Sequence, residues 1–211
     1  MGYRNDIFIS YRRDPETCSW LKIHFMPLLM LRVRQELGRN PVLFVDERIE
    51  SGVSWPAQLG FELGASRILI ALWAKDYFAS KWCTEETVLM LSREKECGFR
   101  TDENPRGLVI PAVIHDGKDF PESLSEIEKF EIQKVFNVRM ARDSPRAEQL
   151  DAILAEQAPA VAAAIEAAPP WRKRWPVTAA RAFRLQLRTV PPSQRLPPRY
   201  TDLPALVVIH G

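Results

Sequence analysis

Short apolar runs alternate with amphipathic segments along the first 168 residues. The apolar runs are rich in branched and aromatic side chains, which predicts strands at residues 6–11, 42–45, 67–73, 108–114 and 135–138. The segments between them predict helices at residues 14–37, 55–63, 81–95, 121–130 and 144–167. Strands that alternate with helices, each apolar along its length, form a parallel sheet covered on both faces. We therefore expect a flavodoxin-like three-layer α/β sandwich with five parallel strands in the order 2-1-3-4-5.

Prolines, glycines and capping residues set the expected boundaries. Asp14 followed by Pro15 predicts the start of the first helix, and Pro27 predicts a kink inside it. Gly64 suits the end of the second helix. Pro111 places the far end of the fourth strand near an edge of the sheet, because proline cannot donate to a ladder.

Ligands of such folds bind beyond the carboxyl ends of the strands, where the strand order reverses. In this chain those ends lead into Arg12 and Arg13, and into residues 46–54, 73–80 and 115–120. The topology alone thus predicts where the chemistry is, before any motif is considered.

Composition narrows the class of protein. Of 211 residues, 46% are hydrophobic and 27% charged, which is typical of a soluble globular chain and argues against global disorder. No apolar run reaches the ~18 residues of a membrane helix, and the amino terminus lacks the pattern of a signal peptide. Three scattered cysteines make no disulfide framework. We expect a cytoplasmic protein with no membrane partner.

The net charge and the proline content of the chain change sharply near residue 169. Residues 169–211 hold eight basic residues and one acid, a net charge of +7, and eight of the 17 prolines. Residues 1–168 hold 21 basic and 26 acidic residues, a net charge of −5. The break predicts a folded domain at 1–168 and a basic, proline-rich tail or linker at 169–211, which leads to a further, sensor-like domain. A nucleic-acid or membrane patch is the other interpretation of such a tail, and we do not predict a nucleic-acid partner.

Several kinds of chemistry lack their motifs. No GxGxxG follows the first strand, and the Walker A and GxSxG motifs are missing, which argues against a dehydrogenase-type pyrophosphate site and a hydrolase elbow. The three histidines are far apart and lack metal-ligand spacing, so we predict no metal site, and we expect His24 at the surface or its boundary.

The candidates that remain follow the first three strands. Arg12 and Arg13 could hold a phosphate or a ribose, or be solvated loop charges. Trp55 could stack on a ring or pack as a helix-start staple. Of the acids in the third helix, Glu85 and Glu86, one faces inward, because successive helical residues lie about 100° apart. Glu86 shares a face with Trp82 and Cys83 and is the better candidate. Cys83 is expected to be a packing residue, since no histidine is placed to activate it.

These residues resemble three boxes of the Toll/interleukin-1 receptor (TIR) domain family. Residues 6–13 (DIFISYRR) resemble the first box, and residues 44–52 resemble the second box with its BB loop. Residues 80–86 (SKWCTEE) resemble the third, a Ser-x-Trp-Cys start followed by a glutamate three residues after the cysteine. The resemblance covers roughly residues 4–168, in the right order and spacing.

The resemblance implies two functions. Bacterial, plant and neuronal members cleave NAD at the nicotinamide–ribose bond, with one essential glutamate at the position of Glu86. In that case NAD is the substrate and no cofactor is needed. Arg12 and Arg13 match a basic pair of NAD-cleaving members, and Trp55 matches an aromatic position after the BB loop. The predicted substrate-binding set is completed by Asp46, Trp82 and Trp73, a bulky indole that narrows the cleft or forms a wall.

The alternative is a non-catalytic signalling or assembly module, as in animal receptors and adaptors. The BB loop here lacks their Arg-Asp-x-x-Pro-Gly string, which favours NAD cleavage. For NAD-cleaving members the resemblance implies activation by self-association and a role in bacterial antiphage immunity. A nucleotide-hydrolase-like or deoxyribosyltransferase-like enzyme is a third possibility. Whether the product is linear or cyclic ADP-ribose stays open.

Overall fold

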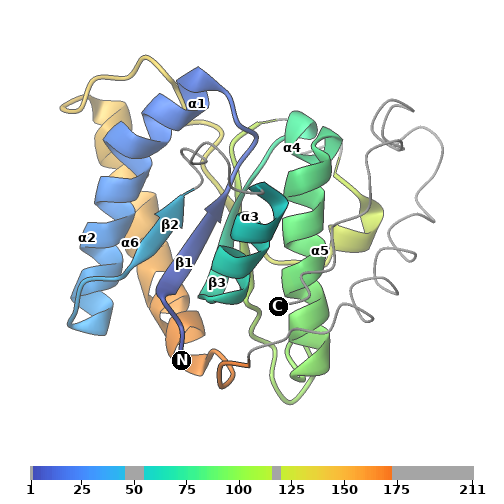
Figure 1. The fold of residues 1–211 in the computed structure, drawn as a ribbon. Helices are drawn as coiled ribbons and strands as arrows, with labels where there is room; N and C mark the ends of the chain where they lie inside the picture. Colours follow the sequence, from blue (N-terminus) through green and yellow to red (C-terminus); the bar gives the residue numbers. More distant parts are fainter. Residues whose placement is uncertain (1, 46–54, 116–119, 173–211) are drawn as a thin grey trace.

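The computed structural model describes residues 2–45, 55–115 and 120–172, and within them a five-stranded parallel sheet forms the centre (Figure 1). The strands are β1 (Asn5–Ser10), β2 (Leu43–Val45), β3 (Ser66–Trp73), β4 (Val109–Val113) and β5 (Phe130–Glu131), in the order β2-β1-β3-β4-β5. This is the predicted fold and strand order, and β1 and β3 are buried almost throughout, as strands covered on both faces must be.

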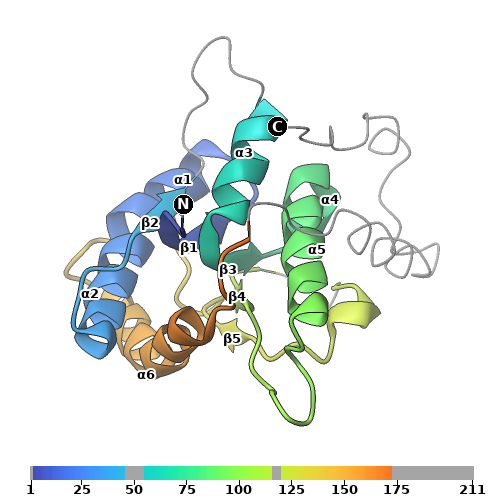
Figure 2. The ribbon, with the colours of Figure 1, turned by 60° about the horizontal axis from the view of Figure 1, so that its bottom comes forward.

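Helices cover both faces of the sheet. They are α1 (Pro15–Trp20), α2 (Met26–Leu37), α3 (Trp55–Gly64), α4 (Lys75–Ala79), α5 (Lys81–Glu96) and α6 (Pro145–Ala167). Helices α2 and α6 pack together on one face, and α3 and α5 lie on the other (Figure 2). No helix within the described ranges combines the length and the apolar character needed to cross a bilayer.

The structure divides the first predicted helix into three consecutive helical segments. Between α1 and α2 lies a π-helical turn, η1 (Leu21–Phe25), and Pro27 stands in the first turn of α2. The interruption predicted at Pro27 therefore takes the form of a π turn just before it, where its missing N–H is tolerated. The turn carries His24 inward to 5% exposure, so the predicted surface position is wrong. Burial, followed by the charge of Arg142, lowers the pKa of His24.

The segment after β4 departs most from the predicted elements. Residues 121–130 hold a short 3₁₀ turn, η2 (Glu122–Leu124), in place of a helix. The fifth strand is Phe130–Glu131, and its prediction at 135–138 is wrong. The N–H groups of Val135 and Phe136 donate to the carbonyl of Ile132, which turns the chain back towards α6. Val135 is buried there without joining a ladder, so its apolar character reflects the core and not a strand.

Pro111 pairs with Ala71 inside the sheet, and β5 pairs with β4 only at Ala112 and Val113. Pro111 is the middle residue of β4, and the far end of β4, at Ala112 and Val113, lies beside the short edge strand β5, as expected. Segment 73–80, where no helix was predicted, contains the additional helix α4. Ser144 caps the last helix, since its Oγ accepts a hydrogen bond from the N–H of Ala147.

Candidate functional site

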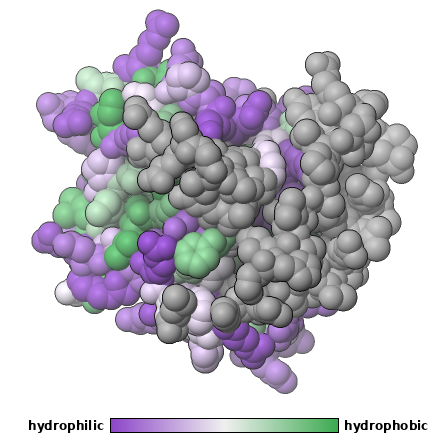
Figure 3. All heavy atoms as spheres, in the orientation of Figure 1, coloured by the Kyte–Doolittle hydropathy of each residue, from purple (hydrophilic) through white to green (hydrophobic). Residues whose placement is uncertain are grey.

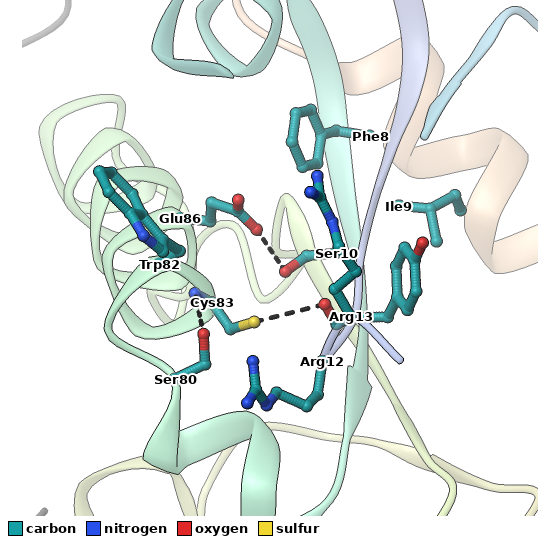
Figure 4. A pocket seen from close by; sticks show the side chains of 10 residues that line it. Phe8, Ile9, Ser10, Arg12, Arg13, Ser80, Trp82, Cys83 and Glu86 are labelled. Carbon is teal, nitrogen blue, oxygen red and sulfur yellow. Dashed lines mark hydrogen bonds between the residues drawn. The ribbon is translucent and has the colours of Figure 1, made fainter. Parts of the chain in front are cut away.

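A cavity of about 220 Å³ opens where β1 ends beside the first two turns of α5 (Figure 4). This is the carboxyl edge of the sheet, next to the point where the strand order reverses between β1 and β3, as the topology predicts. Ten residues line it: Phe8, Ile9, Ser10, Tyr11, Arg12, Arg13, Ser80, Trp82, Cys83 and Glu86. The first and third sequence boxes thus meet in one site.

Glu86 is the acidic residue of this lining. It lies one and a half turns into α5 and is 9% exposed, which removes most of the water from its carboxylate. Ser10, the last residue of β1, donates a hydrogen bond from Oγ to Oε2 of Glu86 across 2.5 Å. A carboxylate in such a place acts strongly on a positive charge nearby, because the surrounding dielectric is low. Glu85 is equally buried but does not line the cavity, as the helical rotation predicts.

Two arginines bring positive charge to the same cavity. Arg12 and Arg13 are both exposed and line it from the segment that follows β1. Consecutive extended residues point in opposite directions, and Figure 4 shows Arg12 extending towards Ser80 while Arg13 extends towards Glu86. Two guanidinium groups on opposite sides of the opening can hold hydroxyl or phosphate oxygens.

Trp82 lies in the first turn of α5, is half-buried and forms part of the cavity wall. Its neighbour Cys83 is 5% exposed, and its Sγ donates to the carbonyl of Tyr11 at 3.4 Å. Burial, followed by the negative charge of Glu86, raises the pKa of Cys83 to about 12. The sulfur is therefore held as a neutral thiol, in agreement with a packing role and not a nucleophilic one.

Three predicted site residues are not placed at the cavity. Trp73 is fully buried and packs its indole against Phe78 and Phe120, with ring centroids 5.2 and 5.4 Å away. The structure therefore puts Trp73 in the hydrophobic core and not in the cavity wall. Trp55 is the first residue of α3, but the position of its side chain lies outside what the structure describes. Asp46 lies outside the described residues, as does the rest of segment 46–54.

Sequence reasoning missed the hydroxyl groups around Glu86. Ser10 lies inside the first box, where its polar side chain ends an otherwise apolar strand, and that contrast was a usable signal. Tyr77 belongs to α4, and its hydroxyl lies 2.8 Å from Ser10 Oγ. No pattern along the chain indicated that contact, because the two residues lie 67 positions apart.

Comparison with known proteins decides the family. The family model described as a TIR domain matches residues 7–154, which include both arginines and Glu86. The chain belongs to the TIR domain family. Its match to the Protein SUPPRESSOR OF npr1-1, CONSTITUTIVE 1 of Arabidopsis thaliana is 28% identical over 127 residues. That match covers 60% of this chain but 8% of the plant protein, so this TIR domain spans a small part of its relative's length.

Two solved structures of TIR domains match this chain at low identity. The TIR domain of the Toll-related receptor TRR-2 from Hydra magnipapillata is 18% identical, with a TM-score of 0.42, over 60% of this chain and 83% of that one. The TIR domains of the activated Roq1 resistosome, which recognises the pathogen effector XopQ, are 17% identical, with a TM-score of 0.36. That match covers 88% of this chain and 98% of the Roq1 chain.

Proposed function

We propose that this TIR domain cleaves the bond between nicotinamide and ribose in NAD, with Glu86 as the catalytic residue. The observation that carries the proposal is the position of Glu86, a buried carboxylate held by Ser10 in the wall of a cavity that two arginines also line. Within the described lining it is the one acidic side chain.

The reaction needs little more than a well-placed negative charge. The C1′–N bond breaks, its electron pair leaves with the nicotinamide nitrogen, and the ribose becomes an oxocarbenium-like cation. Water then adds to C1′ and loses a proton, which gives ADP-ribose, whereas attack by an adenine nitrogen of the same molecule gives a cyclic product. Nicotinamide is a good leaving group because its nitrogen is cationic in NAD, so no strong general acid is required. Glu86 would stabilise the cation as it forms.

The size and charge of the cavity fit one end of the dinucleotide. About 220 Å³ is less than the roughly 300–1,000 Å³ of sites that enclose a drug-sized ligand. We therefore place the nicotinamide and its ribose next to Glu86 and Trp82. The diphosphate would lie at the opening, where guanidinium groups of Arg12 and Arg13 offer paired donors.

Two single substitutions on neighbouring positions test the assignment. Glu86→Gln keeps the size of the side chain and removes its charge, and we expect nicotinamide release to fall by roughly 100-fold or more. Glu85→Gln is the matched control, since Glu85 is 8% exposed on the same helix but does not line the cavity. It should keep the parent rate. A Glu86→Gln protein that releases nicotinamide as fast as the parent would disprove the catalytic role.

A second candidate function is assembly of TIR domains without turnover, and one surface favours it. Ile23, Met30 and Leu31 are 40%, 37% and 41% exposed along η1 and α2. Figure 3 shows hydrophobic side chains along the edge where Figure 1 has α1 and α2. Self-association through this surface and NAD cleavage are compatible. If both occur, NAD turnover per molecule rises with protein concentration, and Leu31→Glu lowers that rise without lowering the rate of dilute protein.

The biological setting extends the same proposal. A TIR domain that destroys NAD when molecules gather would serve immunity, and the resemblance to NAD-cleaving members supports a role in bacterial antiphage defence. Residues 169–211 would then link the domain to its sensor. Their first residues contact the domain, since the hydroxyl of Tyr3 donates to the carbonyl of Pro169 and Arg172 pairs with Glu96 at 3.1 Å.

A further inference from the structure

Three buried hydroxyl groups lie behind Glu86, and the mechanism above does not use two of them. Ser10 Oγ is 2.5 Å from Glu86 Oε2 and 2.8 Å from the hydroxyl of Tyr77. The hydroxyl of Tyr77 is also 2.8 Å from Thr87 Oγ1, and it donates to the carbonyl of Cys83 at 3.1 Å. Ser10, Tyr77 and Thr87 are between 0 and 2% exposed. The cluster joins β1, α4 and α5 in a place that bulk water does not reach.

Counting protons fixes the direction of these hydrogen bonds. An ionised Glu86 can accept but not donate, so Ser10 must give it its single proton. Ser10 then has to accept from Tyr77, whose single proton also faces the carbonyl of Cys83 at the longer distance of 3.1 Å. The oxygen of Tyr77 can accept from Thr87. The hydroxyls thus form a chain that runs Thr87 to Tyr77 to Ser10 to Glu86. Hydrogen bonds aligned in this way polarise and strengthen one another.

The chemistry of Tyr77 suits a permanent donor. Burial raises the pKa of Tyr77 well above its ordinary value, and the negative charge of Glu86 adds to that rise. Its phenol is therefore protonated at neutral pH. The ring is held as well, because Tyr77 packs on Phe78 at 5.3 Å, and Phe78 packs on Trp73. Trp73 thus supports the cluster from the core without lining the cavity.

A glutamate in such a site needs this support. The last torsion of a glutamate side chain is broad, so helix α5 alone does not fix the plane of the carboxylate. The hydrogen bond from Ser10 to Oε2 of Glu86, drawn in Figure 4, restrains that plane. Positions of catalytic groups matter at this scale, since a misplacement of ~1 Å can cost roughly 100-fold in rate.

We propose that Ser10 and Tyr77 are positioning residues, which hold the carboxylate of Glu86 in the orientation that stabilises the developing ribose cation. This inference rests on the proposed NAD cleavage and deepens it. Neither residue has to touch NAD: Ser10 acts through its bond to Glu86, and Tyr77 acts one bond further away through Ser10. Their removal should consequently lower kcat and leave KM nearly unchanged, because the groups that bind the diphosphate stay in place.

The test uses two pairs of matched variants in the 211-residue chain. Ser10→Ala should lower kcat by roughly 10- to 100-fold, and Tyr77→Phe by roughly 3- to 10-fold, the worth of one hydrogen bond. Both should keep KM for NAD within about twofold. Ser66→Ala removes another buried serine hydroxyl, and Tyr3→Phe removes a tyrosine hydroxyl at the other end of α5. These two controls can lower Tm but should keep the parent kcat.

A second measurement does not depend on turnover. If the hydroxyl of Tyr77 acts on the charge of Glu86, the loss of Tm in Tyr77→Phe/Glu86→Gln differs from the sum of the two single losses. Additive losses would overturn the network. If Glu86→Gln is inactive while Ser10→Ala and Tyr77→Phe keep the parent kcat, the positioning role is wrong and the proposed function stands. If Glu86→Gln keeps the parent rate, the proposed function itself fails.

Discussion

Glu86 and Glu94 are both buried on helix α5, eight positions apart, and their surroundings differ. Glu94, near the end of the helix, is 2% exposed and accepts from Arg100 Nε at 2.7 Å and from the N–H groups of Leu108 and Val109 at 2.5 and 2.7 Å. Glu86, near the start, accepts from Ser10 and lines a cavity. One carboxylate is enclosed by donors of its own chain, and the other faces a space that a ligand can enter.

The same difference separates the two ends of the sheet, where the strands begin and where they end. At the amino edge, which we call the paired end (Tyr3, Asp6, Arg93, Glu94 and Arg100), charged groups bind one another or the backbone. At the carboxyl edge, the cavity end (Ser10, Arg12, Arg13, Cys83 and Glu86), the two guanidinium groups and the carboxylate of Glu86 line the cavity. Buried charge at the paired end therefore serves the fold, whereas the buried carboxylate of Glu86 at the cavity end faces a cavity, as the proposed function requires.

The largest effect on stability is expected for Glu94→Gln. The amide places a donor against Arg100 and leaves the guanidinium without its charged partner, so the free energy of unfolding should fall by about 3 kcal/mol. Urea unfolding followed by circular dichroism measures this loss. A variant as stable as the parent would show that the pairing around Glu94 does not support the fold, and the contrast between the two ends would disappear.

Asp6→Asn should have the next largest effect. The carboxylate of Asp6 takes two hydrogen bonds from Arg39, at 2.7 and 2.8 Å, and one from the N–H of Val42 at 2.9 Å. Burial would raise the pKa of Asp6, but these hydrogen bonds outweigh it and leave the pKa below its ordinary value. At neutral pH the substitution should cost about 2 kcal/mol, the range for hydrogen bonds to charged groups.

The pH dependence of that cost has a definite sign. Because the folded protein lowers the pKa of Asp6, the ionised group stabilises the fold at every pH above its unfolded value of about 3.9. The contribution is lost as the pH falls below that value and through the folded pKa. The stability difference between parent and Asp6→Asn should therefore be constant from pH 7 to 5 and shrink below pH 4. A difference that grows on acidification would contradict the assignment.

Arginines of the cavity end should affect binding without affecting the fold. Arg12→Gln and Arg13→Gln each remove an exposed charge, so we expect unchanged unfolding curves and a rise of roughly 10-fold in KM for NAD. Arg146→Gln, an exposed arginine on α6, is the control and should leave KM unchanged. Initial rates over a range of NAD concentrations separate KM from kcat. An equal KM in all four proteins would remove the arginines from the proposed site.

The smallest effect is expected at Cys83. Because the thiol is buried and its pKa is raised to about 12, a thiol reagent should modify the half-buried Cys18 and Cys97 well before Cys83. Mass spectrometry of the partly labelled folded protein identifies the order. Rapid labelling of Cys83 with loss of NAD cleavage would show a reactive cysteine in the cavity, which the structure argues against.

Much of this arrangement could be predicted from the sequence. The continuous apolar character of residues 67–73 and 6–11 predicted the central strands, and the capping signal at Asp14 predicted the start of the first helix. Glu86 could be preferred over Glu85 because helical rotation puts it on the face of Trp82 and Cys83. Those are local signals with a fixed geometric meaning.

The rest depended on contacts that distance along the chain conceals. The two-residue strand β5 has too little pattern to be recognised, and the apolar run at 135–138 looked more strand-like although it only fills the core. Trp73 was predicted to form a wall of the cavity because it ends a strand at the carboxyl edge of the sheet. The aromatic rings that it contacts, however, lie in the core. The bond between Ser10 and Tyr77 exists only once β1 and α4 are packed together.

The most direct measurement compares Glu86 and Glu94 of α5 in one assay. Parent, Glu86→Gln and Glu94→Gln are incubated with NAD at equal concentrations of folded protein, and released nicotinamide is quantified by chromatography. The account predicts that Glu94→Gln, although less stable, keeps the parent rate per folded molecule, while Glu86→Gln loses roughly 100-fold or more. Equal rates in Glu86→Gln and the parent, or the same loss in both variants, would contradict it.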